Sequence, residues 1–203
     1  MLAIYAHLVT IDTDMGISIK KYTPVVAASL LFWALAVLPV PVLAQSEALD
    51  DLFIELQTPD SEDWQAVEKR IWKEWSNSGS DSMDLLLERG RQAIRDGDLE
   101  KAAEHLTALT DHAPEFAEGW NARATVFFLM EEYGLSVADI ETTLSLNPRH
   151  FGALAGLGMI YERVDKPEIA LRAYEQALAV HPYRPDVIEA IKRLKEATQG
   201  TSL

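Results

Sequence analysis

Residues 154–182 read LAGLGMIYERVDKPEIALRAYEQALAVHP, and this stretch decides the fold. Apolar residues recur at helical spacing on both sides of Asp165-Lys166-Pro167, which has the composition of a turn. Pro167 suits the first turn of the helix that follows, because the N–H that proline lacks would have no partner there. The stretch therefore predicts a helix, a short turn and a second helix.

The same arrangement recurs with a period of 34 residues. Pro114, Pro148 and Pro182 are spaced 34 apart, and counting each as position 32 defines units 83–116, 117–150 and 151–184. Small side chains that let paired helices approach closely occupy positions 8 and 20 of every unit: Gly90, Ala124, Gly158, Ala102, Ser136 and Ala170. One such hairpin cannot bury its apolar stripe alone, whereas stacked hairpins form a continuous core.

This pattern resembles the tetratricopeptide repeat (TPR) family, whose 34-residue unit carries large, small and aromatic positions in a fixed order before a proline. The resemblance covers 83–184 and implies an all-α fold, a helix-turn-helix repeat solenoid of three TPR units. Combined with the export signal described below, it points to the exported bacterial type of the family.

Amphipathic segments flank the repeats on both sides. Residues 45–82 are predicted to form an N-terminal helical capping hairpin or degenerate repeat, with its second helix beginning near Thr58-Pro59. Its tryptophans are expected to fill a core. Residues 185–203 are predicted to form a C-terminal capping helix and tail, with an apolar face made of Val187, Ile188, Ile191 and Leu194.

The N-terminus has the three parts of a signal peptide. Lys20 and Lys21 supply positive charge, Val25–Leu38 is apolar, and Val42-Leu43-Ala44 offers small side chains to a signal peptidase. Residues 1–44 are therefore predicted to be a signal peptide, cleaved between Ala44 and Gln45, which sends the protein to the periplasm.

Two alternatives concern this segment. Asp12 and Asp14 place negative charge where a signal peptide needs positive charge, so Met15 is an alternative start. An apolar run shorter than about 20 residues favours removal over anchoring, and the mature protein is then expected to have no membrane contact. If the segment is retained, the chain is a membrane-anchored subunit of an envelope assembly complex.

Composition excludes several functions. The absence of cysteine rules out disulfides, thiol nucleophiles and zinc–thiolate sites. A net charge of −14 disfavours nucleic acid as a partner. No metal-binding, nucleophile-elbow or phosphate-loop motif occurs, and the histidines near the repeat prolines are expected to be turn residues. The sequence thus predicts no enzyme, no cofactor, no metal site and no small-molecule substrate.

The TPR resemblance implies a protein or peptide partner. In this family the first helix of each unit lines a concave groove through positions near 2, 5, 9 and 12. Carried over, the candidate groove residues are Leu87, Arg91, Glu118, Asn121, Thr125, Phe128, Ala155 and Met159. Gly152, Ala155 and Gly156 are expected to leave a depression for a partner backbone. The alternative docking surface is the acidic outer face.

One binding mode of the family is predicted to be absent. Carboxylate-clamp repeats surround a peptide C-terminus with lysines, asparagines and an arginine. The matching places in this sequence hold Leu87, Arg91, Ala122, Gly152 and Gly156, and only Arg91 is basic. The sequence therefore predicts an exported, non-catalytic interaction scaffold that does not clamp a C-terminal carboxylate.

Overall fold

The computed structural model describes residues 41–58 and 63–200, with side chains over 49–58 and 63–197. The described residues from 42 onward form one compact unit. Lys20, Lys21 and the apolar run of the predicted signal lie outside the described residues. The described part is helical: α2 (Pro41–Gln57), α3 (Trp64–Trp75), α4 (Asp81–Arg95), α5 (Leu99–His112), α6 (Ala117–Leu129), α7 (Tyr133–Leu146), α8 (Phe151–Arg163), α9 (Pro167–Val180) and α10 (Pro185–Gly200).

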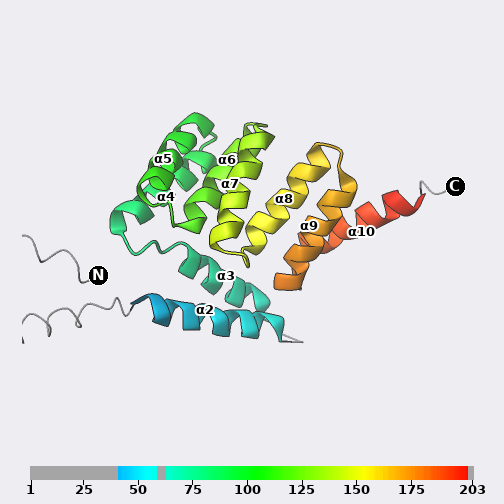
Figure 1. Ribbon diagram of the computed structural model, residues 1–203, viewed down its shortest axis with the longest axis horizontal. Coiled ribbons are helices and arrows are strands. Elements are labelled where there is room, and N and C mark those ends of the chain that lie inside the picture. The colour runs from blue at the N-terminus through cyan, green and yellow to red at the C-terminus, as the bar shows by residue number, and fades with distance from the viewer. Residues whose placement is uncertain (1–40, 59–62, 201–203) are drawn as a thin grey trace, which may run out of the picture. The chain divides into compact units, whose positions relative to one another are not determined.

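Helices α4 to α9 pack as hairpins that stack side by side (Figure 1). Each pair, α4 with α5, α6 with α7 and α8 with α9, is joined by a short turn, and α10 packs against α9. This arrangement confirms the predicted all-α repeat solenoid. The unit boundaries at 83–116, 117–150 and 151–184 stay predictions.

The three hairpin turns share one backbone motif. Gly97, Glu131 and Asp165, spaced 34 residues apart, have positive φ angles of 77°, 61° and 56°. The N–H of the next residue then donates to the carbonyl five residues earlier, in the pairs Asp98–Ala93, Glu132–Phe127 and Lys166–Tyr161. A left-handed residue followed by this hydrogen bond is a Schellman cap, which satisfies carbonyls at the end of a helix.

The small residues at position 8 let the two helices of a hairpin approach closely, as the 34-residue period predicts. A Cβ built on Gly90 would lie 2.5 Å from Cγ of Leu106, and one on Gly158 would lie 2.5 Å from Cε1 of Tyr174. In the middle hairpin, Ser136 at position 20 donates its hydroxyl to the carbonyl of Ala124 at 2.7 Å. The two helices of each hairpin therefore touch through a residue too small to hold them apart.

A buried ion pair fixes the middle of the stack. Nε and Nη2 of Arg123 on α6 donate to the two carboxylate oxygens of Asp139 on α7, at 2.7 and 2.8 Å. Nη1 of Arg123 also donates to the hydroxyl of Thr110 on α5 at 2.8 Å. The guanidinium thus joins three helices, and the carboxylate of Asp139 raises its pKa further.

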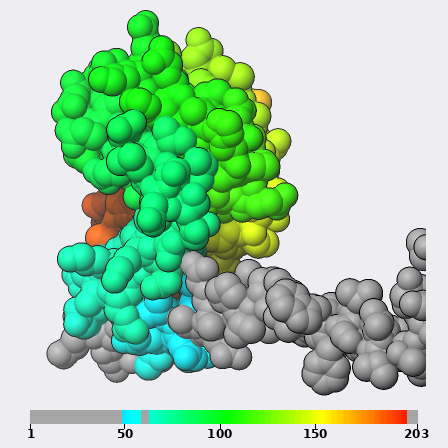
Figure 2. Space-filling model, turned by 90° about the vertical axis from the view of Figure 1, so that its left-hand side faces the viewer, coloured from blue at the N-terminus to red at the C-terminus, as the bar shows by residue number. Residues whose placement is uncertain are grey.

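Helices α2 and α3 span most of residues 45–82, whose assignment as a capping hairpin or degenerate repeat stays a prediction. They lie across the turns that join successive hairpins (Figure 1), and Figure 2, which looks at the α4–α5 end of the stack, shows α3 below these helices. The ring of Trp75 stacks on His150 at 4.2 Å, and the side chain of Phe151 is fully buried in the same cluster. The large aromatic face of α3 is covered there, which explains its position.

Two details of the flanking helices differ from expectation. Helix α3 begins at Trp64 and not near Thr58. Thr58 directly follows the end of α2, and its carbonyl accepts a hydrogen bond from the Tyr183 hydroxyl at 2.8 Å. On α10 the side chain of Ile188 is 45% exposed. The buried face of α10 is instead formed by Val187, Ala190 and Leu194.

Candidate functional site

A cavity of about 170 Å³ opens between α6, α7 and α8. Five of the eight predicted groove residues line it: Asn121, Thr125, Phe128, Ala155 and Met159. The rest of its wall is formed mainly by small and aliphatic residues of the same three helices. The structure therefore brings most of the predicted groove together in one place.

Helical spacing explains the convergence. Asn121, Thr125 and Phe128 are four and three residues apart on α6, so they share one face, and Ala155 and Met159 share a face of α8 in the same way. The Met159 side chain is 46% exposed and is available to a partner. A Cβ on Gly156 would meet only Cδ1 of Ile140, at 3.6 Å, so this glycine leaves open space in the wall.

A second cavity of about 450 Å³ continues the groove toward α10 and shares Ala155 and Met159 with the first. Two charged residues of its rim pair with each other, because Nη2 of Arg193 lies 2.6 Å from Oε1 of Glu162. The Tyr174 hydroxyl donates to the other oxygen of Glu162 at 2.7 Å. Burial, followed by this hydrogen bond, raises the pKa of Tyr174, so the hydroxyl remains a donor at neutral pH.

The other three predicted groove residues do not line either cavity. The side chain of Leu87 is 2% exposed and belongs to the core shared by α4, α5 and α6. The side chain of Glu118 is 3% exposed, and Nη2 of Arg91 lies 2.5 Å from its Oε1. Leu87 and Glu118 are therefore buried and not exposed in the groove, whereas Arg91 stays 28% exposed but is paired with Glu118.

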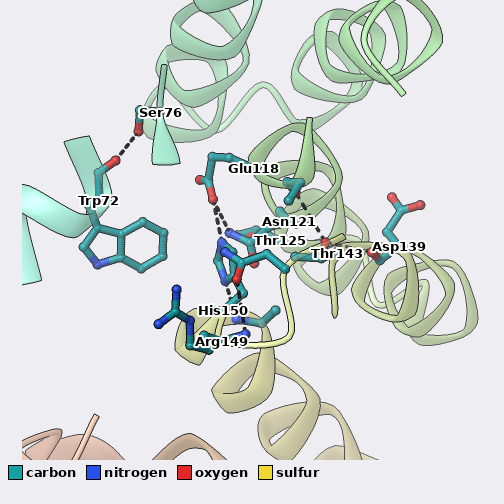
Figure 3. Close-up of polar contacts among 12 residues, drawn as sticks. Trp72, Ser76, Glu118, Asn121, Thr125, Asp139, Thr143, Arg149 and His150 are labelled. Atoms are coloured by element: carbon teal, nitrogen blue, oxygen red, sulfur yellow. Dashed lines mark hydrogen bonds and ion pairs between the residues drawn. The ribbon is translucent and has the colours of Figure 1, made fainter. Parts of the chain in front are cut away.

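Glu118 is the centre of a buried polar network (Figure 3). Besides Arg91, its carboxylate accepts from Nδ2 of Asn121 at 3.2 Å and faces Nε2 of His150 at 2.9 Å. Nδ1 of His150 accepts the N–H of Ala153 at 3.1 Å, so the ring proton resides on Nε2 and is donated to Glu118. The network connects α4, α6 and α8 and holds the Asn121 amide at the edge of the cavity.

Helix α3 covers this network and closes one end of the groove. The Ser76 hydroxyl, at the end of α3, accepts from Nη1 of Arg91 at 3.0 Å and donates to the carbonyl of Trp72 at 2.7 Å. A Cβ on Gly152 would lie 2.6 Å from Cη2 of Trp72, which leaves no room for a side chain. The groove that remains open therefore begins at Asn121 and Gly152.

Several residues of this groove were not predicted from the sequence. Ile140 and Ser136 reach the first cavity from α7, and Arg184 reaches it from the turn before α10. Ala190 and Arg193 of α10 line the second cavity. Extending the 34-residue frame past Pro185 places these two at positions 6 and 9 of a further first helix, a signal that could have identified them.

Over the described side chains, no group of three histidine, aspartate or glutamate residues is arranged to hold a metal ion. Among the helices of 41–58 and 63–200, none combines the length and the apolarity that a membrane span requires.

Comparisons with known proteins agree on the repeat. No family model matches the sequence. A TPR repeat-containing protein of Rhizobium etli is 34% identical over 155 residues, which cover 76% of this chain and 76% of that protein. The small glutamine-rich tetratricopeptide repeat-containing protein 2 of Saccharomyces cerevisiae is 28% identical over 138 residues, covering 68% of this chain and 39% of that protein.

A solved structure shows the same fold. The first TPR domain of Spaghetti, bound to the HSP90 peptide SRMEEVD, superimposes with a TM-score of 0.57 at 21% identity. The match covers 59% of this chain and 95% of that domain.

Proposed function

Because the chain belongs to the tetratricopeptide repeat family, we propose that it is a non-catalytic protein–protein interaction scaffold. It binds a peptide or helix of another envelope protein in the concave groove between α6 and α8. The observation that carries this proposal is the cavity lined by Asn121, Thr125, Phe128, Ala155 and Met159.

The dimensions of the cavity favour a peptide over a small molecule. Sites for small molecules occupy roughly 300–1,000 Å³ and enclose their ligand, whereas here a cavity of about 170 Å³ continues into a second of about 450 Å³ as an open groove that suits an extended chain segment. Its lining of apolar side chains beside one amide suits an amino-acid side chain with its backbone alongside. The first TPR domain of Spaghetti, whose structure is similar to this one, binds an HSP90 peptide, and this supports a peptide as the partner.

Export forms the second part of the proposal. The basic, apolar and small-residue regions of 1–44 support removal of a signal peptide between Ala44 and Gln45 and a periplasmic location. The absence of cysteine in the whole chain fits an oxidising compartment.

A photo-crosslinking experiment tests the groove. Thr125 lines the cavity, while Thr142 lies on α7 outside its lining, and each hydroxyl donates to the carbonyl four residues earlier at 3.1 Å. The two threonines are thus a matched pair. We expect p-benzoylphenylalanine at 125 to form an adduct with a partner protein in cells, and the same residue at 142 to form none.

The substitution Thr125→Arg should abolish that partner's capture, and Thr142→Arg should leave it unchanged. Adducts at 142 with none at 125 would favour the acidic outer face as the docking surface and would overturn the groove proposal.

A further inference from the structure

We infer that the partner segment inserts one large apolar side chain into the cavity between Phe128 and Met159 and carries basic residues beside it. This inference rests on the proposed function and specifies the chemistry of its partner. The partner's basic charge would also distinguish this protein from the first TPR domain of Spaghetti, which binds the acidic peptide SRMEEVD.

The cavity supplies the apolar half of the inference. Phe128, Ile140, Ile160 and Met159 provide its apolar wall, and Gly156 leaves space in that wall. Burying one leucine or phenylalanine side chain there removes a large apolar surface from water and so favours binding. Anchors of this kind, seated in a pocket at the centre of an interface, dominate binding energy.

The cavity does not offer an unpaired charge to an acidic group. Among the described residues that line it, the one charged side chain is Arg184. Its Nε donates to Oδ1 of Asp186 at 2.9 Å, and its Nη1 lies 4.0 Å from Glu68. An acidic partner residue would have to displace these carboxylates.

The net charge of the first two hairpins of the stack favours a basic partner. Residues 81–146, which form α4 to α7, contain 14 acidic and 5 basic residues, a net charge of −9, whereas 147–200 contain 7 and 8, a net charge of +1. Exposed Glu131 and Glu132 follow shortly after Phe128, and the Glu131 N–H donates to the Phe128 carbonyl at 3.1 Å. Basic residues next to the anchor would therefore meet a complementary field.

The contact of α3 with Gly152 limits how far a partner segment can extend along the groove. Gly152 contacts Trp72 on one side and lines the open cavity on the other. The cavity thus continues an interface that already accommodates a large aromatic side chain. A partner segment must lie beside α3 and run toward α7 or α10.

The experiment uses defined peptides and fluorescence anisotropy with the full chain. Four nonapeptides are blocked at both ends: three have a central leucine flanked by lysine, by glutamine or by glutamate, and a fourth has alanine in place of leucine between lysines. We expect the lysine–leucine peptide to bind at least about tenfold tighter than the glutamate peptide at low salt. Replacing leucine by alanine should weaken binding about tenfold or more, and SRMEEVD should not bind.

A pair of glycine variants supplies the control. Gly156→Leu fills the cavity, whereas Gly134→Leu adds the same side chain on α7, where a Cβ meets nothing within 4 Å. We expect Gly156→Leu to abolish binding of the lysine–leucine peptide and Gly134→Leu to leave it unchanged. Equal binding of the lysine and glutamate peptides, or of the leucine and alanine peptides, overturns this inference.

The outcome of the crosslinking experiment keeps the two proposals apart. If position 125 crosslinks to a partner but the peptides bind without regard to flanking charge, the groove function stands and the inferred chemistry is wrong. If position 125 forms no crosslink and none of the peptides binds, both the groove function and the inferred partner chemistry are wrong.

Discussion

At the scale of single residues, a missing side chain allows the helices of the third hairpin to touch. Gly158 meets the ring of Tyr174 so closely that a Cβ would lie 2.5 Å from Cε1. Tyr174 cannot retreat freely, since it is buried and its hydroxyl is bonded to Glu162. We therefore expect Gly158→Leu to destabilise the protein by about 1–3 kcal/mol or more, through overpacking. Urea denaturation measures the change.

The control for Gly158→Leu is Gly134→Leu, which introduces the same side chain at a position where a Cβ has open space around it. Its free energy of unfolding should stay within about 0.5 kcal/mol of wild type. Equal stability of the Gly158 and Gly134 variants would mean that the helices do not meet at position 8.

Arg91 behaves differently from what its place in the repeat predicts. From sequence we expect a groove residue whose loss weakens binding and leaves melting intact. The structure pairs it with a carboxylate that is 3% exposed, so Arg91→Ala leaves Glu118 with fewer partners away from water. We expect a loss of about 1–3 kcal/mol in the free energy of unfolding.

Arg89, exposed on the same helix, provides the comparison. Arg89→Ala should change the free energy of unfolding by less than about 0.5 kcal/mol. Unchanged stability of the Arg91 variant would restore it as a residue available to the partner.

At the scale of elements, the docking of α3 depends on a carboxylate. Nε2 of His181 makes no hydrogen bond and lies 3.7 Å from Oε2 of Glu68 on α3. The imidazole is the main cause that lowers the pKa of Glu68 below its ordinary value of 4.5, while partial burial opposes the shift. A carboxylate with a lowered pKa stabilises the fold above its ordinary pKa, and this contribution is lost as the pH falls through the lowered value.

The expected result is a pH-dependent difference between two proteins. Glu68→Gln should melt below wild type at pH 7, and the gap should shrink as the pH falls below 4.5. Circular dichroism at a series of pH values measures both melting temperatures, and Glu141→Gln, which changes an exposed carboxylate of α7, is the control. A gap that does not change with pH contradicts the role given to Glu68.

The elements also show how far sequence reaches. The 34-residue period predicts the hairpins, the close contact at Gly158 and the face of α6 that bears Asn121, Thr125 and Phe128, because all three follow from local helical spacing. The burial of Glu118 does not follow, since it depends on α3 folding back across the turns between hairpins. That contact joins Trp75 to His150, 75 residues apart in the chain, and no periodic pattern encodes it.

At the scale of the whole molecule, export stays a prediction, and intact-mass measurement or N-terminal sequencing of the protein can test it. The proposed cleavage between Ala44 and Gln45 falls within the bounds of α2. We expect N-terminal sequencing of the protein from the envelope fraction to begin at Gln45. A product that retains residues 25–44 would instead favour the anchored subunit of an envelope assembly complex.

The central claim is that a partner segment occupies the groove between α6 and α8, and Met159 reports on it directly. Its side chain is 46% exposed in the cavity lining, whereas Met83 packs against the core of α4 and α5. The measurement is a methyl NMR titration of methionine-labelled protein with the blocked lysine–leucine nonapeptide. If the segment occupies the groove, the Met159 methyl signal should shift saturably and the Met83 signal should stay unchanged. Saturable binding that leaves the Met159 signal unmoved would contradict it.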